Sequence, residues 1–417
     1  MTVATEVTAP PRAGLGAGVV ALLAIVIFIN YVDRGNLATA APLMKDELHL
    51  TGTQLGMLFS AFFWTYIPSQ ILAGWLAERI TAYRTLALGV FVWSLATAAT
   101  GLASGFGVLL ALRLALGIGE SAAFPCSSKL LARHLPADKL GTANGAIATG
   151  LALGPAFGTF AGGMLMNELG WRAIFLLFGI APLLWLVPWL SVTRDAARSA
   201  DETSYGREPN FRDLLRRREL WGACIGHCCS NYAFYFVISW LPLYLVKSRG
   251  FTVPEMATLA GVIYLGYAAS ALVSGWLADY WMRCGATANR VRKTSMIVSL
   301  SGVAASMLGC AFGDVRVCIA SLLLAGIFFG PGTVNVYAIG QTLAGPRAAG
   351  KWVSIQNCIG NLSGLMGPLI TGFIIDRTGN FFWAFAAACA ITLLGVIAWG
   401  VIIPRIAPLA WAPRTEF

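Results

Sequence analysis

Asn-Tyr-Val-Asp-Arg-Gly-Asn, residues 30–36, closes the first apolar run of the chain with two adjacent charges. Residues 14–29 before it and residues 37–43 after it are uncharged. If this segment spans a membrane, Asp33 and Arg34 lie within the lipid, at a cost of about 3 kcal/mol each on insertion scales. Because such costly residues are usually retained for function, the pair predicts a functional site.

The composition is that of a membrane protein with many spans. Of the 417 residues, 57% are hydrophobic and only 12% are charged, whereas soluble domains carry about 25% charged residues. The length accommodates about a dozen spans of ~20–28 residues joined by short loops. The net charge of +10 is explained below by basic loops, so no nucleic-acid partner is expected. The lipid bilayer is the expected surrounding.

The apolar runs predict an all-α membrane protein of twelve transmembrane helices. The longest stretch without an apolar run, residues 194–218, predicts a cytoplasmic linker between two six-helix bundles at 15–193 and 219–405. The predicted spans are residues 15–43, 53–77, 83–103, 106–132, 142–166, 171–192, 220–246, 256–280, 295–312, 316–341, 350–375 and 380–404.

Lys and Arg residues predict the orientation of these spans. With both termini in the cytoplasm, 21 of the 29 Lys and Arg lie on the inner side and six on the outer side. This bias agrees with the positive-inside rule. No cleavage site follows the first apolar run, which is therefore expected to be a true span. The nine scattered cysteines indicate small buried side chains rather than disulfides.

Two motifs recur at matching spans of the two halves of the chain. The stretch Gly-Trp-Leu-Ala-Glu-Arg at 74–79 returns as Gly-Trp-Leu-Ala-Asp-Tyr at 275–280, and Gly-Pro at 154–155 returns at 367–368. The order and the spacing of about half a chain predict a parallel duplication. The two bundles should therefore be pseudo-symmetric.

The first of these motifs resembles the loop between spans two and three of the major facilitator superfamily. Glu78 stands where that family usually has Asp. The resemblance implies a gating role for Gly74, Glu78 and Arg79, and for Asp279 at the matching place in the second half. It also implies transport by alternating access.

Further motifs resemble the anion:cation symporter family, which includes bacterial galactonate, glucarate and hexuronate transporters and the human vesicular glutamate and sialic acid carriers. They are residues 30–34, residues 60–66, and Arg113 with Gly117, Glu120, Phe124 and Pro125. The resemblance implies a carrier of organic anions in a bacterial-type inner membrane. Sugar-acid transporters of the family commonly have Gln where this chain has Leu151. The apolar residue disfavours a polyhydroxylated substrate and leaves less hydroxylated or aromatic carboxylates as candidates.

Asp33, Arg34, Arg113 and Glu120 are the Asp, Glu, Lys or Arg residues that lie well inside the predicted spans. Two acids and two bases sum to zero charge. From their depths along the spans, we expect Asp33 to pair with Arg113 and Arg34 to reach Glu120. The alternative is a set of static ion pairs that lock two helices together.

Charge pairing leads to a hypothesis for coupled transport. A carboxylate substrate needs a cationic partner, and Arg34 is the first candidate, with Arg113 as a second. When the substrate takes Arg34, Glu120 loses its counter-charge and binds a proton more readily. Asp33 and Glu120 are thus the expected proton carriers. H⁺ is the expected coupling ion, and no other cofactor is expected.

Uncharged residues complete the predicted site. Ser354, Asn357 and Asn361 share one helix face, and Asn357 is the best candidate for a hydrogen bond to substrate. Tyr31, Trp64 and Tyr66 are expected to wall the pocket. For Tyr31, Tyr66 and Asn357 the family resemblance favours this role over simple helix packing.

Other function classes have weaker support. Cys224 and His227 share a face, but no further ligands accompany them, so no metal site is expected. No phosphate loop or hydrolase motif occurs, so no enzyme is expected. The sequence therefore predicts a proton-coupled importer of an organic carboxylate, expected to act as a monomer. An antiporter or facilitator of the same fold and a non-transporting ligand sensor stay open as alternatives.

Overall fold

The computed structural model describes residues 17–202 and 209–411, and all regular structure in this part of the chain is helical. Both termini lie outside these residues, as does the middle of the predicted linker. The elements are α1 (Ala17–Glu47), α2 (Gly52–Arg79), α3 (Ala82–Thr100), α4 (Phe106–Glu120), α5 (Ala123–His134), α6 (Leu140–Glu202), α7 (Phe211–Leu215), α8 (Arg218–Arg249), α9 (Val253–Arg283), α10 (Ala288–Phe312), α11 (Val315–Gly360), α12 (Leu362–Thr378), α13 (Phe382–Ile397) and the π-helical η1 (Ala398–Ile402).

Several of these elements differ from the predicted spans in where they begin and end. α6 joins two predicted spans across a turn at Gly170, and α11 does the same at Gly345. Both glycines have positive φ, 75° and 66°, which a residue without a Cβ adopts at little cost. The predicted span 106–132 is instead divided into α4 and α5. If α6 and α11 are each divided at their glycine turn, and α4 with α5, the end of α11 with α12, and α13 with η1 are each counted as one span, the helices are consistent with twelve spans.

Among the described residues, nine stretches are long and apolar enough to cross a membrane. α8 carries His227, Ser230 and Asn231, which line the central cavity described below. These polar residues lie inside a predicted span and face the interior of the protein, as polar residues within spans usually do.

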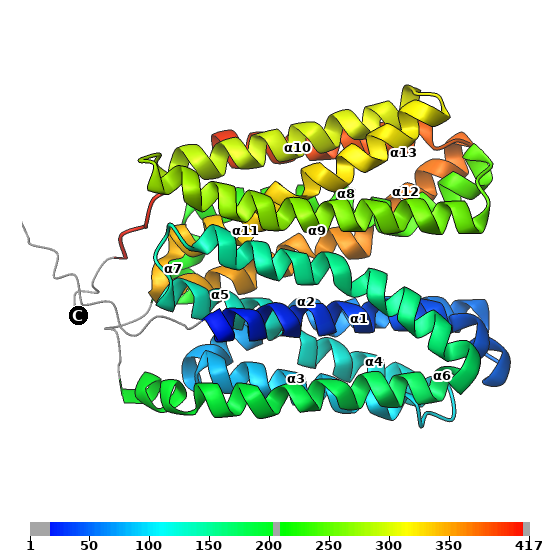
Figure 1. Cartoon of the computed structure of the whole chain (residues 1–417), viewed down its shortest axis with the longest axis horizontal. Coiled ribbons are helices and arrows are strands. Elements are labelled where there is room, and N and C mark those ends of the chain that lie inside the picture. The colour runs from blue at the N-terminus through cyan, green and yellow to red at the C-terminus, as the bar shows by residue number, and fades with distance from the viewer. Residues whose placement is uncertain (1–16, 203–208, 412–417) are drawn as a thin grey trace, which may run out of the picture.

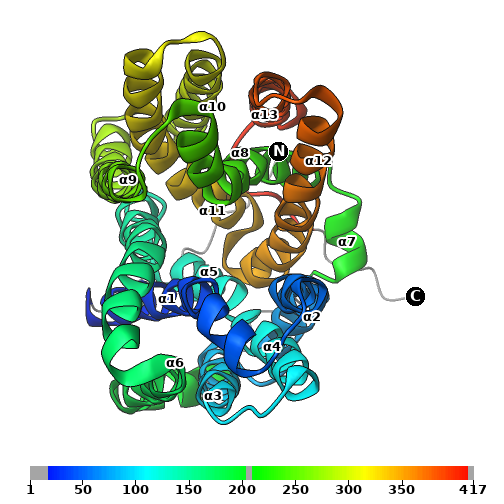
Figure 2. The same cartoon turned by 90° about the vertical axis from the view of Figure 1, so that its right-hand side faces the viewer.

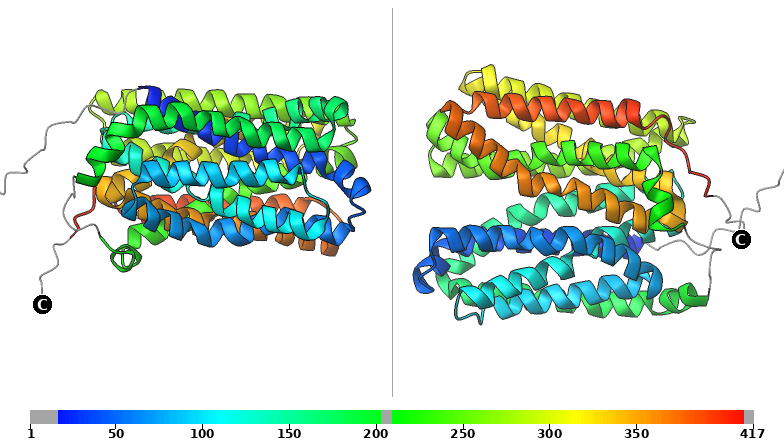
Figure 3. Two further views of the ribbon diagram at one scale, coloured as in Figure 1. Left: turned by 90° about the horizontal axis from the view of Figure 1, so that it is seen from below. Right: turned by 180° about the vertical axis from the view of Figure 1, so that it is seen from behind.

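The helices form two groups that lie side by side (Figure 1). α1–α6 occupy the lower half of the view and α8–α13 the upper half, with their axes along the long dimension of the molecule. The view along the helices in Figure 2 and the rear view in Figure 3 show the same division. Within the predicted linker 194–218, α6 continues to Glu202 and α7 forms a short helix. Residues 203–208 are not described.

A close approach between α1 and α6 positions the charged stretch. A Cβ on Gly154 would lie 2.5 Å from the Cβ of Tyr31, and one on Gly158 would lie 2.5 Å from the carbonyl oxygen of Val32. Small residues at such crossings let two helix backbones pack directly. The first apolar helix is thereby held against α6 at the level of Asp33 and Arg34.

The two groups contact each other at the predicted cytoplasmic side. Lys351 of α11 forms an ion pair with Glu78 of α2. The carboxylate of Asp279 on α9 accepts hydrogen bonds from the backbone N–H groups of Gly141 (2.9 Å) and Thr142 (2.6 Å) at the start of α6. A carboxylate at a helix N-terminus satisfies free N–H groups and complements the helix dipole. These contacts close that side of the molecule.

The predicted gating residues do not all take part in this closure. Gly74 packs against Ser354, to which a Cβ would come within 2.5 Å. Arg79 is exposed, and its guanidinium lies 5.1 Å from the centre of the Trp75 ring within the same helix. Among the described residues Arg79 makes no ion pair with the other half. The gating role that the resemblance implies for Arg79 stays a prediction.

Removal of the Asp279 carboxylate should loosen this closure. In Asp279→Ala, the amides of Gly141 and Thr142 lose charge-assisted bonds of about 1.5–3 kcal/mol each. We expect hydrogen exchange of peptide 139–145 to be at least tenfold faster than in the wild type. Asp314→Ala removes an N-cap of α11 that bonds the amide of Val317, and it should leave this peptide unchanged. Equal protection in Asp279→Ala and the wild type would contradict the role of Asp279.

A second ion pair lies at the opposite end of the first group. Glu47, at the end of α1, accepts hydrogen bonds from Trp171 Nε1 (2.5 Å) and Arg172 Nε (2.9 Å). Arg172 also donates to the carbonyl oxygens of Gly101 and Ala103. The hydrogen bonds from Trp171 and Arg172 hold the pKa of Glu47 below its usual value. This cluster of exposed Glu47, buried Trp171 and half-buried Arg172 ties α1 to the turn at Gly170.

The lowered pKa of Glu47 predicts a pH-dependent contribution to stability. A depressed carboxylate pKa stabilises the fold above the unfolded value of about 4.3, and this stabilisation is lost as pH falls through the folded value. We expect Glu47→Gln to lower the Tm at pH 7 and the difference from wild type to shrink below about pH 4. A difference in Tm that stays constant down to pH 3.5 would contradict this.

Candidate functional site

A central cavity lies between the two groups of helices. Tyr31 and Tyr66 line it from the first group, and Tyr235, Asn357 and Asn361 line it from the second. Tyr31, Tyr66 and Asn357 were predicted to belong to the site, and the structure brings them together around one space. The polar residues lie near the middle of their helices, where a transporter of this architecture would hold its substrate.

Arg34 lies next to this cavity inside a cage of aromatic rings. Its guanidinium carbon is 4.5 Å from the ring centre of Tyr31 and 4.8 Å from those of Phe62 and Tyr66. Nη2 lies 3.3 Å from Oε2 of Glu120, which confirms the predicted contact between these residues. The Arg34 side chain retains 17% exposure, and Nε and Nη2 have no hydrogen-bond partner. The aromatic cage therefore holds a guanidinium whose Nε and Nη2 can still donate hydrogen bonds.

Glu120 is fully buried at the end of α4, where the helix is interrupted. Pro125 follows five residues later at the start of α5. A proline cannot donate to the carbonyl four residues before it, and its ring clashes with that carbonyl. The regular helix consequently stops between Glu120 and Ala123. Both carboxylate oxygens of Glu120 lack a hydrogen-bond partner, so the nearby guanidinium is the main group that stabilises its charge.

Asp33 and Arg113 do not form the predicted ion pair. Asp33 instead accepts hydrogen bonds from Asn36 Nδ2 and Thr97 Oγ1, each at 3.4 Å. Arg113 is buried, and its Nε has no hydrogen-bond partner. Asp33, Arg113, Arg34 and Glu120 are all absent from the residues that line the cavity, and Arg34 comes next to it through the rings of Tyr31 and Tyr66. Direct binding of substrate by Arg113 stays a prediction.

Trp64 also lies elsewhere than predicted. It is 49% exposed and is not among the residues that line the cavity. Tyr66, two residues away on the same helix, is 1% exposed and turns inward. Since residues two apart lie on different faces of a helix, both could not wall the same pocket.

Asn357 lines the cavity, but its amide is already engaged. Its Nδ2 donates to Oε1 of Gln70 across the two groups (2.9 Å), and its Oδ1 accepts from the hydroxyl of Tyr337 (3.1 Å). Asn361 accepts from the hydroxyl of Tyr235 (2.8 Å) and marks the break between α11 and α12. These asparagines thus form the polar wall of the site, and Asn357 links the two halves.

Some cavity residues were not part of the predicted site. His227, which was considered only as a metal ligand, lines the cavity with its ring centre 5.6 Å from that of Tyr337. Among the described residues no three His, Cys, Asp or Glu side chains are grouped to hold a metal ion. Gln70, which accepts a hydrogen bond from Asn357, was not predicted because a single amide side chain within a span forms no pattern with other polar residues in the sequence.

The family is decided by comparison with known proteins. The family model described as Major Facilitator Superfamily matches residues 23–284 and 282–417. The chain belongs to the major facilitator superfamily. It is also similar to the solved structure of the transporter FucP, with a TM-score of 0.67 and 16% identity over 92% of this chain and 98% of that one. The predicted all-α fold is thereby confirmed.

Curated relatives cover nearly the whole chain. It is 28% identical to the hexuronate transporter of Bacillus subtilis (strain 168), over 95% of this chain and 96% of the relative. It is 26% identical to a probable galactarate/D-glucarate transporter of the same organism, over 92% and 91%. A probable sulfoacetate transporter of Cupriavidus necator is 27% identical, over 91% and 92%.

These relatives confirm the resemblance to organic-anion transporters. The superfamily and the relatives are membrane transporters, so this member of the major facilitator superfamily is a multi-pass transporter and not an enzyme. The fold, the buried charges and the central cavity are the features expected of such a protein.

Because the aromatic cage surrounds a planar guanidinium, we expect that lysine at position 34 cannot preserve carboxylate binding. Lys keeps the charge but lacks the planar fork that binds a carboxylate with two parallel hydrogen bonds. We expect Arg34→Lys to weaken carboxylate binding at least tenfold in a thermal-shift titration. The matched control is Arg79→Lys, on the exposed end of α2, which should bind as the wild type does. Wild-type affinity in Arg34→Lys would contradict a role of Arg34 in binding.

Proposed function

We propose that this protein imports an organic carboxylate together with protons by alternating access. The observation that carries the proposal is the buried pair of Arg34 and Glu120 beside the central cavity. Arg34 has guanidinium nitrogens without hydrogen-bond partners, and Glu120 depends on Arg34 for its counter-charge. A carboxylate that reaches the cavity therefore competes with Glu120 for the same cation.

This competition couples the anion to a proton. When a substrate carboxylate takes up the guanidinium, Glu120 is left buried without a counter-charge. A buried carboxylate in that situation is stabilised by protonation. Binding of the substrate and binding of the proton then favour each other, and this coupling is reciprocal. Asp33, on the other side of the cluster, is the second proposed proton carrier.

Binding of the substrate and the proton would also shift the balance between the conformations that open to either side of the membrane. With Glu120 neutral and the anion on Arg34, neither member of the Arg34–Glu120 pair is left as an unpaired charge, and the site can face either side of the membrane at lower cost. In this structure the contacts of Glu78 and Asp279 close the predicted cytoplasmic side. The proposed cycle requires these contacts to break after substrate and proton have bound. We propose that a monomer in the bacterial inner membrane suffices for this cycle.

The named substrates of the relatives support an anionic cargo. Hexuronate and galactarate or glucarate are carboxylates, and sulfoacetate carries both a carboxylate and a sulfonate. A planar guanidinium binds the oxygens of either group. The shared feature that the proposal transfers to this chain is the acidic group and not the sugar.

Glu120→Gln in proteoliposomes tests the proton coupling. An imposed pH gradient, acidic outside, should drive carboxylate accumulation by the wild type. Gln cannot bind the proton, so we expect at least a tenfold loss of gradient-driven uptake, while exchange between equal pools of substrate persists. Glu47→Gln, which changes an exposed carboxylate at the end of α1, should behave as the wild type does.

The outcomes separate the proposal from its alternatives. Unchanged pH dependence in Glu120→Gln would remove Glu120 from coupling. Exchange without net uptake in the wild type would indicate an antiporter, and equilibration without response to the gradient would indicate a facilitator. Ligand binding without any flux would indicate a sensor and would overturn the proposal of transport.

A further inference from the structure

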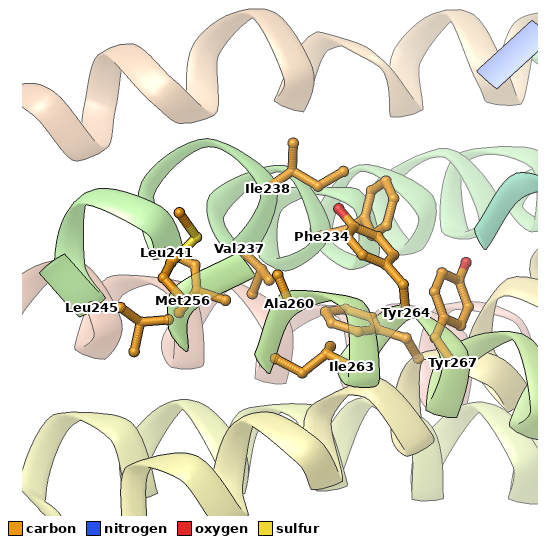
Figure 4. A pocket seen from close by; sticks show the side chains of 11 residues that line it. Phe234, Val237, Ile238, Leu241, Leu245, Met256, Ala260, Ile263, Tyr264 and Tyr267 are labelled. Carbon is orange, nitrogen blue, oxygen red and sulfur yellow. The ribbon is translucent and has the colours of Figure 1, made fainter. Parts of the chain in front are cut away.

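A second cavity lies between α8 and α9, beside the central one (Figure 4). Its lining is almost wholly apolar and includes Val237, Leu241 and Leu245 of α8 and Met256, Ala260 and Ile263 of α9. The side chains from the two helices point toward one another across this space. Its volume, taken as the space open to the centre of a water molecule, is about 70 Å³. One water needs ~10–15 Å³ by that measure, so several carbon atoms fit.

Three aromatic residues belong to both cavities. Phe234, Tyr267 and Phe329 line the central cavity and also the α8/α9 cavity. Their ring centres are about 6 Å apart, at 6.1 Å for Phe234 and Tyr267 and 5.9 Å for Phe234 and Phe329. The two cavities are therefore neighbours that share one aromatic wall rather than separate sites.

A continuous aromatic path leads from this wall to Arg34. The ring of Phe234 lies 5.7 Å from that of Tyr235, which lies 6.0 Å from that of Phe63. Phe63 in turn contacts Tyr66, one of the rings of the guanidinium cage. The central cavity is lined by Tyr31 and Tyr66 of the cage and also by the shared aromatic wall. A molecule in this cavity whose anionic group lies next to Arg34 can therefore contact that wall with its apolar part.

The hydrogen-bonding groups of the central cavity are largely engaged with one another. Besides the amides of Asn357 and Asn361, the hydroxyls of Tyr267 and Thr333 bond each other at 2.6 Å. Ser299 donates to the carbonyl of Phe328, and Ser230 to that of Gly226. A hydroxyl-rich substrate would have to compete with these bonds, and an unmade bond on a buried group costs about 1–3 kcal/mol. An apolar group faces no such competition.

We propose that the carboxylate carried by this protein bears an apolar group, such as a phenyl ring or a short alkyl chain, which occupies the α8/α9 cavity. The inference rests on the proposed function, since it places the carboxylate at Arg34. Leu151 in the lining of the central cavity adds apolar surface to the same substrate. The aromatic wall of Phe234, Tyr267 and Phe329 contacts the junction between the acid and its tail.

Matched acids test this proposal by binding to the purified protein. Propionate, hexanoate and 3-phenylpropionate share a carboxylate and differ in their apolar part, whereas gluconate carries hydroxyls instead. Burial of a methylene strengthens binding about fourfold. We expect Kd to fall about fourfold per methylene from propionate toward hexanoate, and 3-phenylpropionate to bind at least tenfold more tightly than propionate and gluconate.

Ala260→Phe fills the cavity and makes the test specific. It should raise the Kd of 3-phenylpropionate at least tenfold and change that of propionate less than twofold. The matched control is Ala269→Phe on the same helix, where residue 269 is exposed and does not line the cavity. Met256→Ala enlarges the cavity, and it should shift the preference toward acids longer than hexanoate. This second variant keeps the test decisive if Ala260→Phe does not fold.

Each contrary result has a distinct meaning. If gluconate binds in an Arg34-dependent manner and the apolar acids do not, the apolar-tail proposal is overturned while the proposed function stands. The same holds if Ala260→Phe weakens propionate and 3-phenylpropionate equally, or if lipid and not the acid occupies the cavity. If neither class of acid binds, the proposed function fails as well.

Discussion

An arginine and a glutamate buried together among apolar helices impose a constraint on the whole molecule. Each charge of the Arg34–Glu120 pair stabilises the other, because an isolated buried charge costs several kcal/mol. Much of the first helix group serves to hold the pair: the cage around Arg34, the close packing of α1 on α6, and the helix end at Glu120. An anion that enters such a site can compete with Glu120 for Arg34 and so change the ion pair on which the site depends.

Both groups interrupt a helix at the level of the site. α4 stops at Glu120 ahead of Pro125, and α11 stops next to Asn361. Irregular backbone is tolerated at membrane depth only where protein or a polar cavity surrounds it. The two breaks therefore agree with the position of the cavity between the groups. They also bring backbone groups and side chains of different helices to one place, which an unbroken helix would not do.

The contacts across the two groups differ from the contacts within them. Within a group, glycines and rings pack closely, as Gly154 does against Tyr31. Across the groups, close packing of the same kind is joined by polar pairs. Gly275 of α9 packs against Gly141 and Gly145 of α6, and the rings of Phe124 and Tyr337 stack with their centres 4.8 Å apart. Glu78 with Lys351 and Asp279 with the start of α6 add charged contacts that water can replace with little net change in free energy.

The sequence alone determined the fold class, the family and the charged pair, because an Asp-Arg step inside an apolar run and a motif repeated half a chain later are local signals. It also predicted the contact of Arg34 with Glu120 from their depths. Only the tertiary structure decided the partners of Asp33 and Arg113, the outward position of Trp64, and the places of Gln70 and His227. Helix rotation sets these, and in lipid-surrounded helices apolar residues on every side leave little amphipathic signal to reveal it.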